Sequence, residues 1–163
     1  MTSQQVLIAG GGIGGLTAAL CLAKKGFEVA VFEQAPELVA IGAGIQLSPN
    51  CTRVLHDLGL EAELRKYAFL PEGTQFRNWR TGQVIGESAL GESVIQKYGV
   101  PYYHIHRGDL LKVLCDAVEQ TRKVQINTDA RVDSFSQTEN RVLLNTKQGD
   151  FSGDILIGAD GIH

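Results

Sequence analysis

A glycine-rich turn near the N-terminus constrains the fold of this chain more than any other feature of the sequence. The apolar run Val6–Ala9 leads into six residues of which five are glycine, at 10–15, and an apolar pattern with helical spacing follows. Gly10, Gly12 and Gly15 have the G-x-G-x-x-G spacing. The first glycine permits a tight turn, the second lets the backbone approach a pyrophosphate, and the third lets the helix lie against the strand. The sequence therefore predicts a strand, a turn and a helix whose start faces an anion.

An acidic residue follows the second apolar run at the spacing that this motif requires. Phe27–Phe32 reads as a strand and ends at Glu33, about 20 residues after the glycines, where a carboxylate meets the two hydroxyls of an adenosine ribose. A carboxylate repels a 2′-phosphate, so we expect the nucleotide to be FAD or NAD rather than NADP. The alternative is a glycine-rich turn that only packs.

Composition narrows the class of protein. The 163 residues are 44% hydrophobic and 20% charged, which indicates a globular chain long enough to bury a core. The net charge of -3 disfavours nucleic acid as a partner. Val6–Ala23 is uncharged, but its glycines and the absence of positive charge in residues 1–5 disfavour a membrane span or a secretion signal. Cys21, Cys51 and Cys115 form no C-x-x-C pair and are expected to be reduced core residues of a cytoplasmic protein.

The segment after the second strand departs from a plain NAD-binding Rossmann domain, in which a helix and a third parallel strand usually come next. Residues Gln34–Gln46 read as a loop that contains the run Ile-Gly-Ala-Gly-Ile at 41–45. Ser48 and Pro49 then begin a helix, and Glu61–Tyr67 forms a shorter one. The apolar face of the first helix is expected to comprise Cys51, Val54, Leu55 and Leu58.

A β-hairpin is predicted further along the chain. Thr74–Arg80 and Gln83–Ile85 flank Thr81-Gly82 and read as its two strands. The hairpin belongs to an apparent insertion from a second sheet. We therefore expect a FAD-binding domain formed by residues 1–70 and 105–163, with a β insertion of the substrate domain at 71–104.

Two histidines and an arginine follow this insertion. His104 and His106 alternate on an expected strand, and because no Cys, Asp or Glu stands at ligand spacing beside them, ordinary core or edge histidines are favoured over a metal site. Arg107 precedes Gly108-Asp109, which we expect to cap a helix, so its cation and the helix start can converge on a phosphate. A solvated arginine is the alternative.

The C-terminal third is predicted to be mainly β-structure. Val124–Ile126, Ala130–Phe135 and Arg141–Thr146 suggest a small antiparallel meander. A further apolar strand over 154–158 runs into Asp160-Gly161, and ligands of open α/β sheets gather at such strand ends. Asp160 is otherwise a simple turn residue.

Taken together, these motifs resemble those of the FAD-dependent aromatic hydroxylases, and the salicylate and hydroxybenzoate hydroxylase group most of all. The resemblance covers the whole chain. Its fold implication is an α/β protein with a Rossmann-like FAD-binding βαβ core, a β-meander and a partial β insertion, truncated relative to the family. The motifs are Gly10–Gly15, Glu33-Gln34, Gly42–Gln46, His106–Leu110 and Gly158–Ile162.

The resemblance also implies a FAD site. Its residues would be Gly10, Gly12 and Gly15 at the pyrophosphate, Glu33 at the adenosine ribose, Gly44 and Ile45 near the isoalloxazine or ribityl chain, Arg107 near the flavin chain or pyrophosphate, Val132 near the adenine through its backbone, and Asp160 as the acid of the Asp-Gly motif. Ile13, Gly14 and Gln34 are further cofactor-binding residues that the resemblance implies. Some relatives carry a histidine base where this chain has Gln46, so no catalytic residue is assigned.

The implied reaction is reduction of FAD by NADH or NADPH, followed by hydroxylation of a phenolic aromatic acid with O₂. Family members continue for a longer second half, so we expect the 163-residue chain alone to bind FAD weakly, to hydroxylate little or nothing and to self-associate. No nucleic acid or membrane partner is expected. Two alternatives remain open: a non-catalytic flavin- or nucleotide-binding module, and an NAD-dependent Rossmann dehydrogenase, which the interrupted βαβ pattern disfavours.

Overall fold

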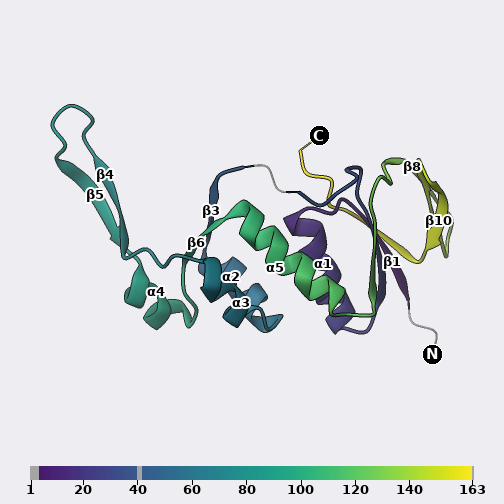
Figure 1. Ribbon diagram of the computed structural model, residues 1–163, viewed down its shortest axis with the longest axis horizontal. Helices are drawn as coiled ribbons and strands as arrows, with labels where there is room; N and C mark the ends of the chain where they lie inside the picture. The colour runs from purple at the N-terminus through teal and green to yellow at the C-terminus, as the bar shows by residue number, and fades with distance from the viewer. Residues whose placement is uncertain (1–3, 40–41, 163) are drawn as a thin grey trace. The chain divides into compact units, whose positions relative to one another are not determined.

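The computed structural model describes residues 4–39 and 42–162 and divides the chain into two compact units (Figure 1). The first unit combines the N-terminal segment up to residue 40 with the residues from 110 onward, and the second comprises residues 41–109. Each unit is described by itself.

A four-stranded parallel sheet organises the first unit. Its strand order is β11-β1-β2-β7. The predicted α/β fold with a βαβ core is therefore confirmed, but the expectation that residues 124–126 belong to an antiparallel meander is wrong. They pair in parallel with β2 and supply the third parallel strand, which the second unit separates from β2 in the sequence. The strands are β1 (Gln5–Ala9), β2 (Glu28–Phe32), β7 (Val124–Asn127) and β11 (Ile155–Gly158).

Side chains alternate between the two faces of this sheet and build two separate cores. Val6, Ile8, Val29 and Val31 pack with Ala19 of α1 (Ile13–Lys24) on one face. The other face packs against the meander, through Leu7, Ala30, Phe32, Ala130 and Leu144. The layers are thus helix, parallel sheet and meander, as Figure 1 shows from α1 through β1 to β8 and β10.

The meander has three antiparallel strands in the order β10-β9-β8. Two of them match the prediction. The third was not predicted because Gly149 and Asp150 resemble a turn, although the strand they begin pairs fully with β9. The strands are β8 (Val132–Gln137), β9 (Val142–Thr146) and β10 (Gly149–Gly153).

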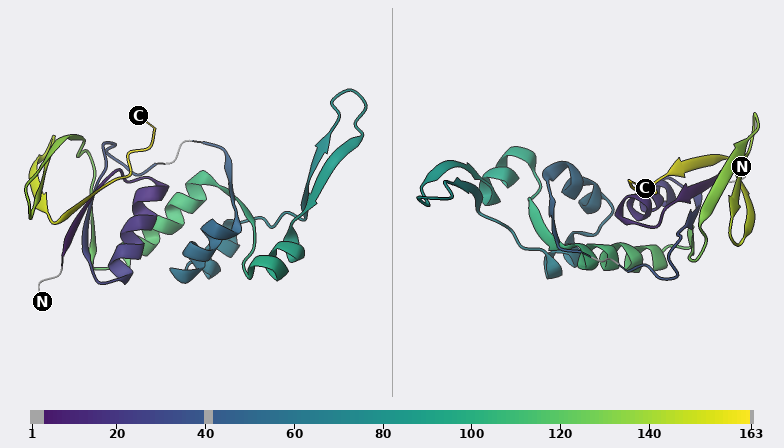
Figure 2. Two further views of the ribbon diagram at one scale, coloured as in Figure 1. Left: turned by 180° about the vertical axis from the view of Figure 1, so that it is seen from behind. Right: turned by 90° about the horizontal axis from the view of Figure 1, so that it is seen from above.

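The second unit contains two β-ribbons and three short helices. The predicted hairpin and the helix over 61–67 are confirmed, and Figure 2 shows the hairpin as a ribbon that projects away from α2 and α3. Helix α4 was not predicted. The elements are β3 (Gly44–Leu47) paired with β6 (Tyr103–His106), α2 (Pro49–Asp57), α3 (Glu61–Tyr67), the hairpin β4 (Gly73–Arg77) and β5 (Val84–Ala89), and α4 (Gly91–Tyr98). Helix α5 (Arg107–Glu119) crosses the boundary between the units.

Two expectations about this region need correction. The loop predicted over 34–46 ends at Gly44, because Gly44–Leu47 forms β3 against β6; residue Ile41 of its glycine run lies outside the described residues. Helix α2 buries Thr52 and Leu55, whereas Cys51 and Val54 of the expected apolar face are exposed. The buried stripe is displaced because the Thr52 hydroxyl donates to the Pro101 carbonyl, 2.7 Å away, and so turns this face inward.

Within the described ranges, no helix is long and apolar enough to cross a membrane. The uncharged stretch near the N-terminus is divided between β1 and α1.

The inner face of the meander should be essential for stability. Leu144 is fully buried against the sheet, whereas its neighbour Leu143 points to the other face and is 39% exposed. Leu144→Ala should lower the free energy of unfolding by about 2–5 kcal/mol because it removes buried contacts and leaves a cavity. Urea denaturation followed by circular dichroism measures this loss. Leu143→Ala is the matched control, and an equal loss in both variants would contradict the two-core description.

Candidate nucleotide-binding site

The glycine turn packs against the end of β11 more closely than any side chain would permit. Gly10 has a φ of +111°, and a Cβ built on it would lie 2.3 Å from the Ala159 carbonyl oxygen. A Cβ on Gly15 would lie 1.9 Å from the Gly10 carbonyl oxygen. These two glycines therefore let strand, turn and helix approach, in agreement with the predicted roles of the first and third motif glycines.

Two glycines of the turn, Gly12 and Gly14, leave open space at the start of α1. A Cβ on Gly12 or on Gly14 would meet no atom within 4 Å. Gly12 is the N-cap, Ile13 begins the helix, and among the described residues no side chain caps this start and no acidic residue occupies its first turn. The first intrahelical bond runs from the Leu16 N–H to the Gly12 carbonyl, 3.0 Å, so the preceding N–H groups point out of the helix. This combination is suited to an anion.

Glu33 braces the turn from the end of β2. Its Oε2 accepts a hydrogen bond from the Gly11 N–H at 2.7 Å, and its Oε1 accepts one from the Ala35 N–H at 2.9 Å. Sequence reasoning assigned this carboxylate to a ribose only and missed the bracing contact. An ionised carboxylate has about four acceptor positions, so both oxygens can still accept hydroxyl groups. Gln34, the next predicted residue, is exposed.

Asp160 and Val132 line one cavity of about 550 Å³. Asp160 follows β11, and its backbone nitrogen is so close to Gly10 that a Cβ there would lie 2.9 Å from it. Val132 begins β8. The structure thus brings Asp160 to the glycine turn, at the carboxyl ends of parallel strands where ligands of such sheets bind. The cavity is lined by Ala9, Val132, Phe135, Gln137, Val142, Asp154, Ile155, Leu156, Gly158 and Asp160.

The remaining predicted residues form a second group, within the second unit. Gly44 and Ile45 lie on β3 and pair with His106 and Ile105 of β6. Arg107 is exposed, and its backbone N–H donates to the Ala43 carbonyl at 3.3 Å.

The expectation that Gly108-Asp109 caps the helix after Arg107 is wrong. Helix α5 begins at Arg107 itself, because His106 provides the cap: its Nδ1 accepts a hydrogen bond from the Gly108 N–H at 3.2 Å. His106 is exposed and His104 is half-buried. In the part of the chain that the structure describes, no group of three or more His, Cys, Asp or Glu side chains has a geometry that could hold a metal ion.

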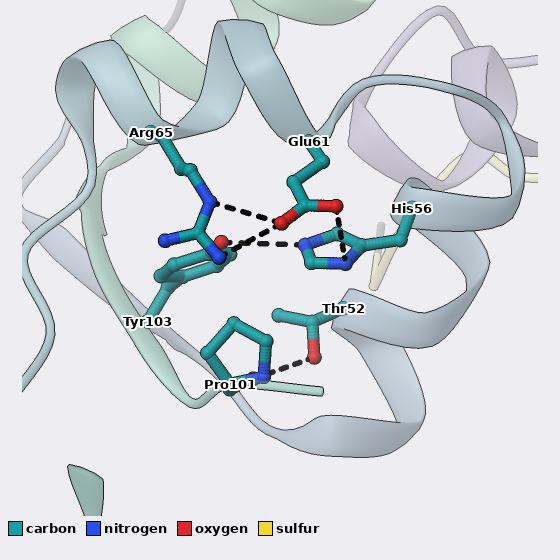
Figure 3. A network of polar contacts seen from close by, with 6 residues as sticks. All are labelled: Thr52, His56, Glu61, Arg65, Pro101 and Tyr103. Carbon is teal, nitrogen blue, oxygen red and sulfur yellow. Dashed lines mark hydrogen bonds and ion pairs between the residues drawn. The ribbon is translucent and has the colours of Figure 1, made fainter. Parts of the chain in front are cut away.

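A polar network that sequence reasoning missed holds β6 from its inner side (Figure 3). Tyr103 is fully buried, and its hydroxyl lies 3.3 Å from His56 Nε2. Nδ1 of the same imidazole lies 3.6 Å from Glu61 Oε2, and Arg65 donates to Glu61 Oε1 at 2.8 and 2.9 Å. The i,i+4 spacing of Glu61 and Arg65 is the one part of this network that could have been predicted from the sequence. The network joins α2, α3 and β6.

Hydrogen bonding, charge and burial shift the pKa values of Glu61, Arg65 and Tyr103 in this network. The hydrogen bond from Arg65 and the nearby His56 hold the pKa of Glu61 below its usual value. Burial raises the pKa of Tyr103, an effect that Arg65 partly opposes. Tyr103 therefore remains a neutral hydroxyl near pH 7.

The parallel sheet covered by α1, together with the glycine turn and the uncapped start of that helix, defines a dinucleotide-binding α/β domain of Rossmann type. Comparison with known proteins identifies the family: the model described as "FAD binding domain" matches residues 3–163. The chain belongs to this family, which confirms the resemblance to flavin-dependent aromatic hydroxylases.

Individual relatives agree with this placement. The chain is 41% identical over 158 residues to a 3-hydroxybenzoate 6-hydroxylase of Polaromonas naphthalenivorans, covering 96% of this chain and 40% of that protein. It is 39% identical over 160 residues to a 3-amino-4-hydroxybenzoate 2-monooxygenase of Streptomyces cremeus, covering 98% and 40%. A crystal structure of Klebsiella pneumoniae HpxO complexed with FAD and uric acid superimposes with a TM-score of 0.82 at 28% identity, covering 97% and 39%. The chain thus spans about 40% of the length of the curated relatives it matches.

The residues of the first unit fit a flavin dinucleotide. The open space over Gly12 and Gly14 admits a pyrophosphate, the uncapped N–H groups of α1 suit its charge, and Glu33 keeps acceptor capacity for ribose hydroxyls.

The ion pair between Glu61 and Arg65 should make stability depend on pH. Because the pKa of Glu61 is lowered on folding, its stabilisation is present above the unfolded value of 4.5 and is lost as pH falls below it. The difference in unfolding free energy between wild type and Glu61→Gln should therefore narrow below that pH in urea titrations. When the same comparison is made in proteins that also carry Arg65→Gln, the difference in unfolding free energy should depend much less on pH. A difference between wild type and Glu61→Gln that does not change with pH would contradict the ion pair.

Proposed function

We propose that this chain forms the FAD-binding part of a flavin-dependent monooxygenase that hydroxylates a phenolic aromatic acid of the salicylate or hydroxybenzoate type. NADH or NADPH would donate the electrons, and O₂ would supply the oxygen atom. One observation carries the proposal: the start of α1 is uncapped, open at Gly12 and Gly14, and braced by Glu33. The reaction class is supported by the names of the relatives, which act on hydroxylated aromatic acids.

The residues of the first unit would hold the adenosine diphosphate part of FAD. Gly10 and Gly15 shape the turn, while the backbone of Gly12, Ile13 and Gly14 would face the pyrophosphate. Glu33 would accept hydrogen bonds from the adenosine ribose, with Gln34 beside it. The backbone of Val132 would contact the adenine, and Asp160 would lie at the turn from the β11 side.

The residues of the second unit would contact the flavin half. Gly44 and Ile45 would lie near the isoalloxazine or ribityl chain. Arg107 would place its guanidinium near the flavin chain or pyrophosphate. Its side chain is exposed, and its backbone N–H is hydrogen-bonded to the carbonyl of Ala43, the residue before β3. FAD, when bound, supplies the redox and oxygen-transfer chemistry, and the residues of the chain bind and orient it.

A side chain at Gly12 should block FAD without unfolding the protein. The position has φ -75° and ψ -173°, which a β-branched residue adopts, and its surroundings are open. Gly12→Val should therefore keep the melting temperature and weaken FAD binding at least about tenfold, or about 1.4 kcal/mol. Quenching of flavin fluorescence measures the affinity.

The matched control is Gly86→Val, at a strand position of the β4–β5 hairpin where a new Cβ makes only an ordinary contact with Phe76. It should leave FAD binding unchanged. Equal FAD affinity in Gly12→Val and wild type would contradict the pyrophosphate assignment.

The proposed reaction is tested with the protein in its full natural length, loaded with FAD. Oxidation of NADH or NADPH should be stimulated by 3-hydroxybenzoate or salicylate, and the hydroxylated product should appear in stoichiometric amount when coupling is complete. The 163-residue chain alone should show little of this activity. Tight FAD binding by the full-length protein without stimulation by any phenolic acid would favour a non-catalytic flavin-binding module instead.

A further inference from the structure

One face of the ribbon formed by β3 and β6 is buried and held in place by contacts with the rest of the second unit. Tyr103 and Ile105 of β6 and Leu47 of β3 are buried, and the network of His56 holds Tyr103 in place. Because side chains alternate across a strand, a fixed inner face fixes the register and therefore the outer face as well.

The outer face presents a polar and aromatic cluster around His104. His104 and Gln46 are directly paired across the two strands. The Tyr102 hydroxyl donates to Gln46 Oε1 at 2.7 Å, and the Tyr102 ring lies edge-on to the imidazole, 5.7 Å between centroids. Phe69 contributes a second ring 6.4 Å from His104 and is joined to it by two backbone hydrogen bonds of 2.7 and 2.8 Å. Three chain segments thus converge on one imidazole.

The polar groups of this cluster have capacity left for a ligand. Across residues 4–39 and 42–162, no side chain or backbone group hydrogen-bonds to the His104 ring. The ring contacts the aromatic rings of Phe69 and Tyr102, and the hydrogen bonds of this residue are made by its backbone. Gln46 accepts from Tyr102 through its oxygen, so its amide N–H groups remain donors. A neutral imidazole offers one donor and one acceptor, which matches a hydroxyl group.

We propose that this outer face binds the ring of the phenolic substrate and that His104 hydrogen-bonds the phenolic oxygen. The inference rests on the proposed function, since it names the substrate-reading residue of the same reaction. Phe69 and Tyr102 provide ring surfaces for a planar ligand, and Gly44, one of the proposed flavin contacts, lies two residues from Gln46 and so on the same face of the ribbon as His104. A site that hydrogen-bonds a hydroxyl discriminates strongly against the analogue that lacks it.

The test compares two ligands that differ only in this hydroxyl. Isothermal titration calorimetry of the FAD-loaded protein in its full natural length measures the Kd of 3-hydroxybenzoate and of benzoate. His104→Leu should weaken 3-hydroxybenzoate binding about tenfold and change benzoate binding less than about twofold, because benzoate has no phenolic hydroxyl and loses no hydrogen bond in the variant. His104→Gln should restore part of the preference, since the amide again hydrogen-bonds.

The matched control is His56→Gln, which removes an imidazole from the opposite side of the same ribbon. It should lower stability but keep the ratio of the two Kd values. An unchanged ratio in His104→Leu, or an equal loss for both ligands, overturns the role of His104 while the proposed function stands. A wild type that prefers no phenolic acid over benzoate, and whose NAD(P)H oxidation no phenolic acid stimulates, overturns both.

Discussion

The close contact between the glycine turn and the end of β11 is the constraint on which the first unit depends. Gly10 and Gly15 occupy positions where a Cβ would lie 2.3 and 1.9 Å from carbonyl oxygens. No rearrangement of a flexible side chain relieves such a clash, because the obstructing atoms belong to the backbone. The absence of two Cβ atoms thus determines how near β1, α1 and β11 approach, and with it the direction of the helix start.

This arrangement separates packing from binding within one short motif. Gly10 and Gly15 are required by the fold, whereas Gly12 and Gly14 face open space and are available to a ligand. Glu33 links the two functions, because the carboxylate that braces Gly11 lies at the end of the strand beside the turn. The proposed pyrophosphate site therefore needs no rearrangement of this turn, and little conformational entropy should be lost there on binding.

The sequence predicted the parts of this structure that local chemistry determines. The βαβ unit, the β4–β5 hairpin and α3 follow from glycine spacing, turn residues and apolar periodicity. Pairing partners were harder to predict: Val124–Asn127 joins the parallel sheet because β2 offers a buried neighbour, a long-range relation that a four-residue run does not encode. Likewise β10 begins with turn-like residues and becomes a strand only because β9 pairs with it.

Some features of the candidate site could likewise be predicted from the sequence, whereas others depend on the fold. The turn glycines and Glu33 were readable from spacing, yet the bracing bond to Gly11 was not, since it depends on three-dimensional approach. His106 as a helix cap, and the joining of His56 to Tyr103 across 47 residues, likewise require the fold. The i,i+4 pair of Glu61 and Arg65 was the one part of that network that the sequence displayed.

The central claim, that the start of α1 is a preformed pyrophosphate site, is tested most directly by amide NMR. A titration of the ¹⁵N-labelled chain with FAD, followed in ¹H–¹⁵N correlation spectra, reports each backbone N–H separately. We predict that the largest shifts occur at Gly12, Ile13 and Gly14, and that the Gly11 amide retains its hydrogen bond to Glu33. Binding that leaves these amides unchanged and shifts resonances elsewhere would contradict it.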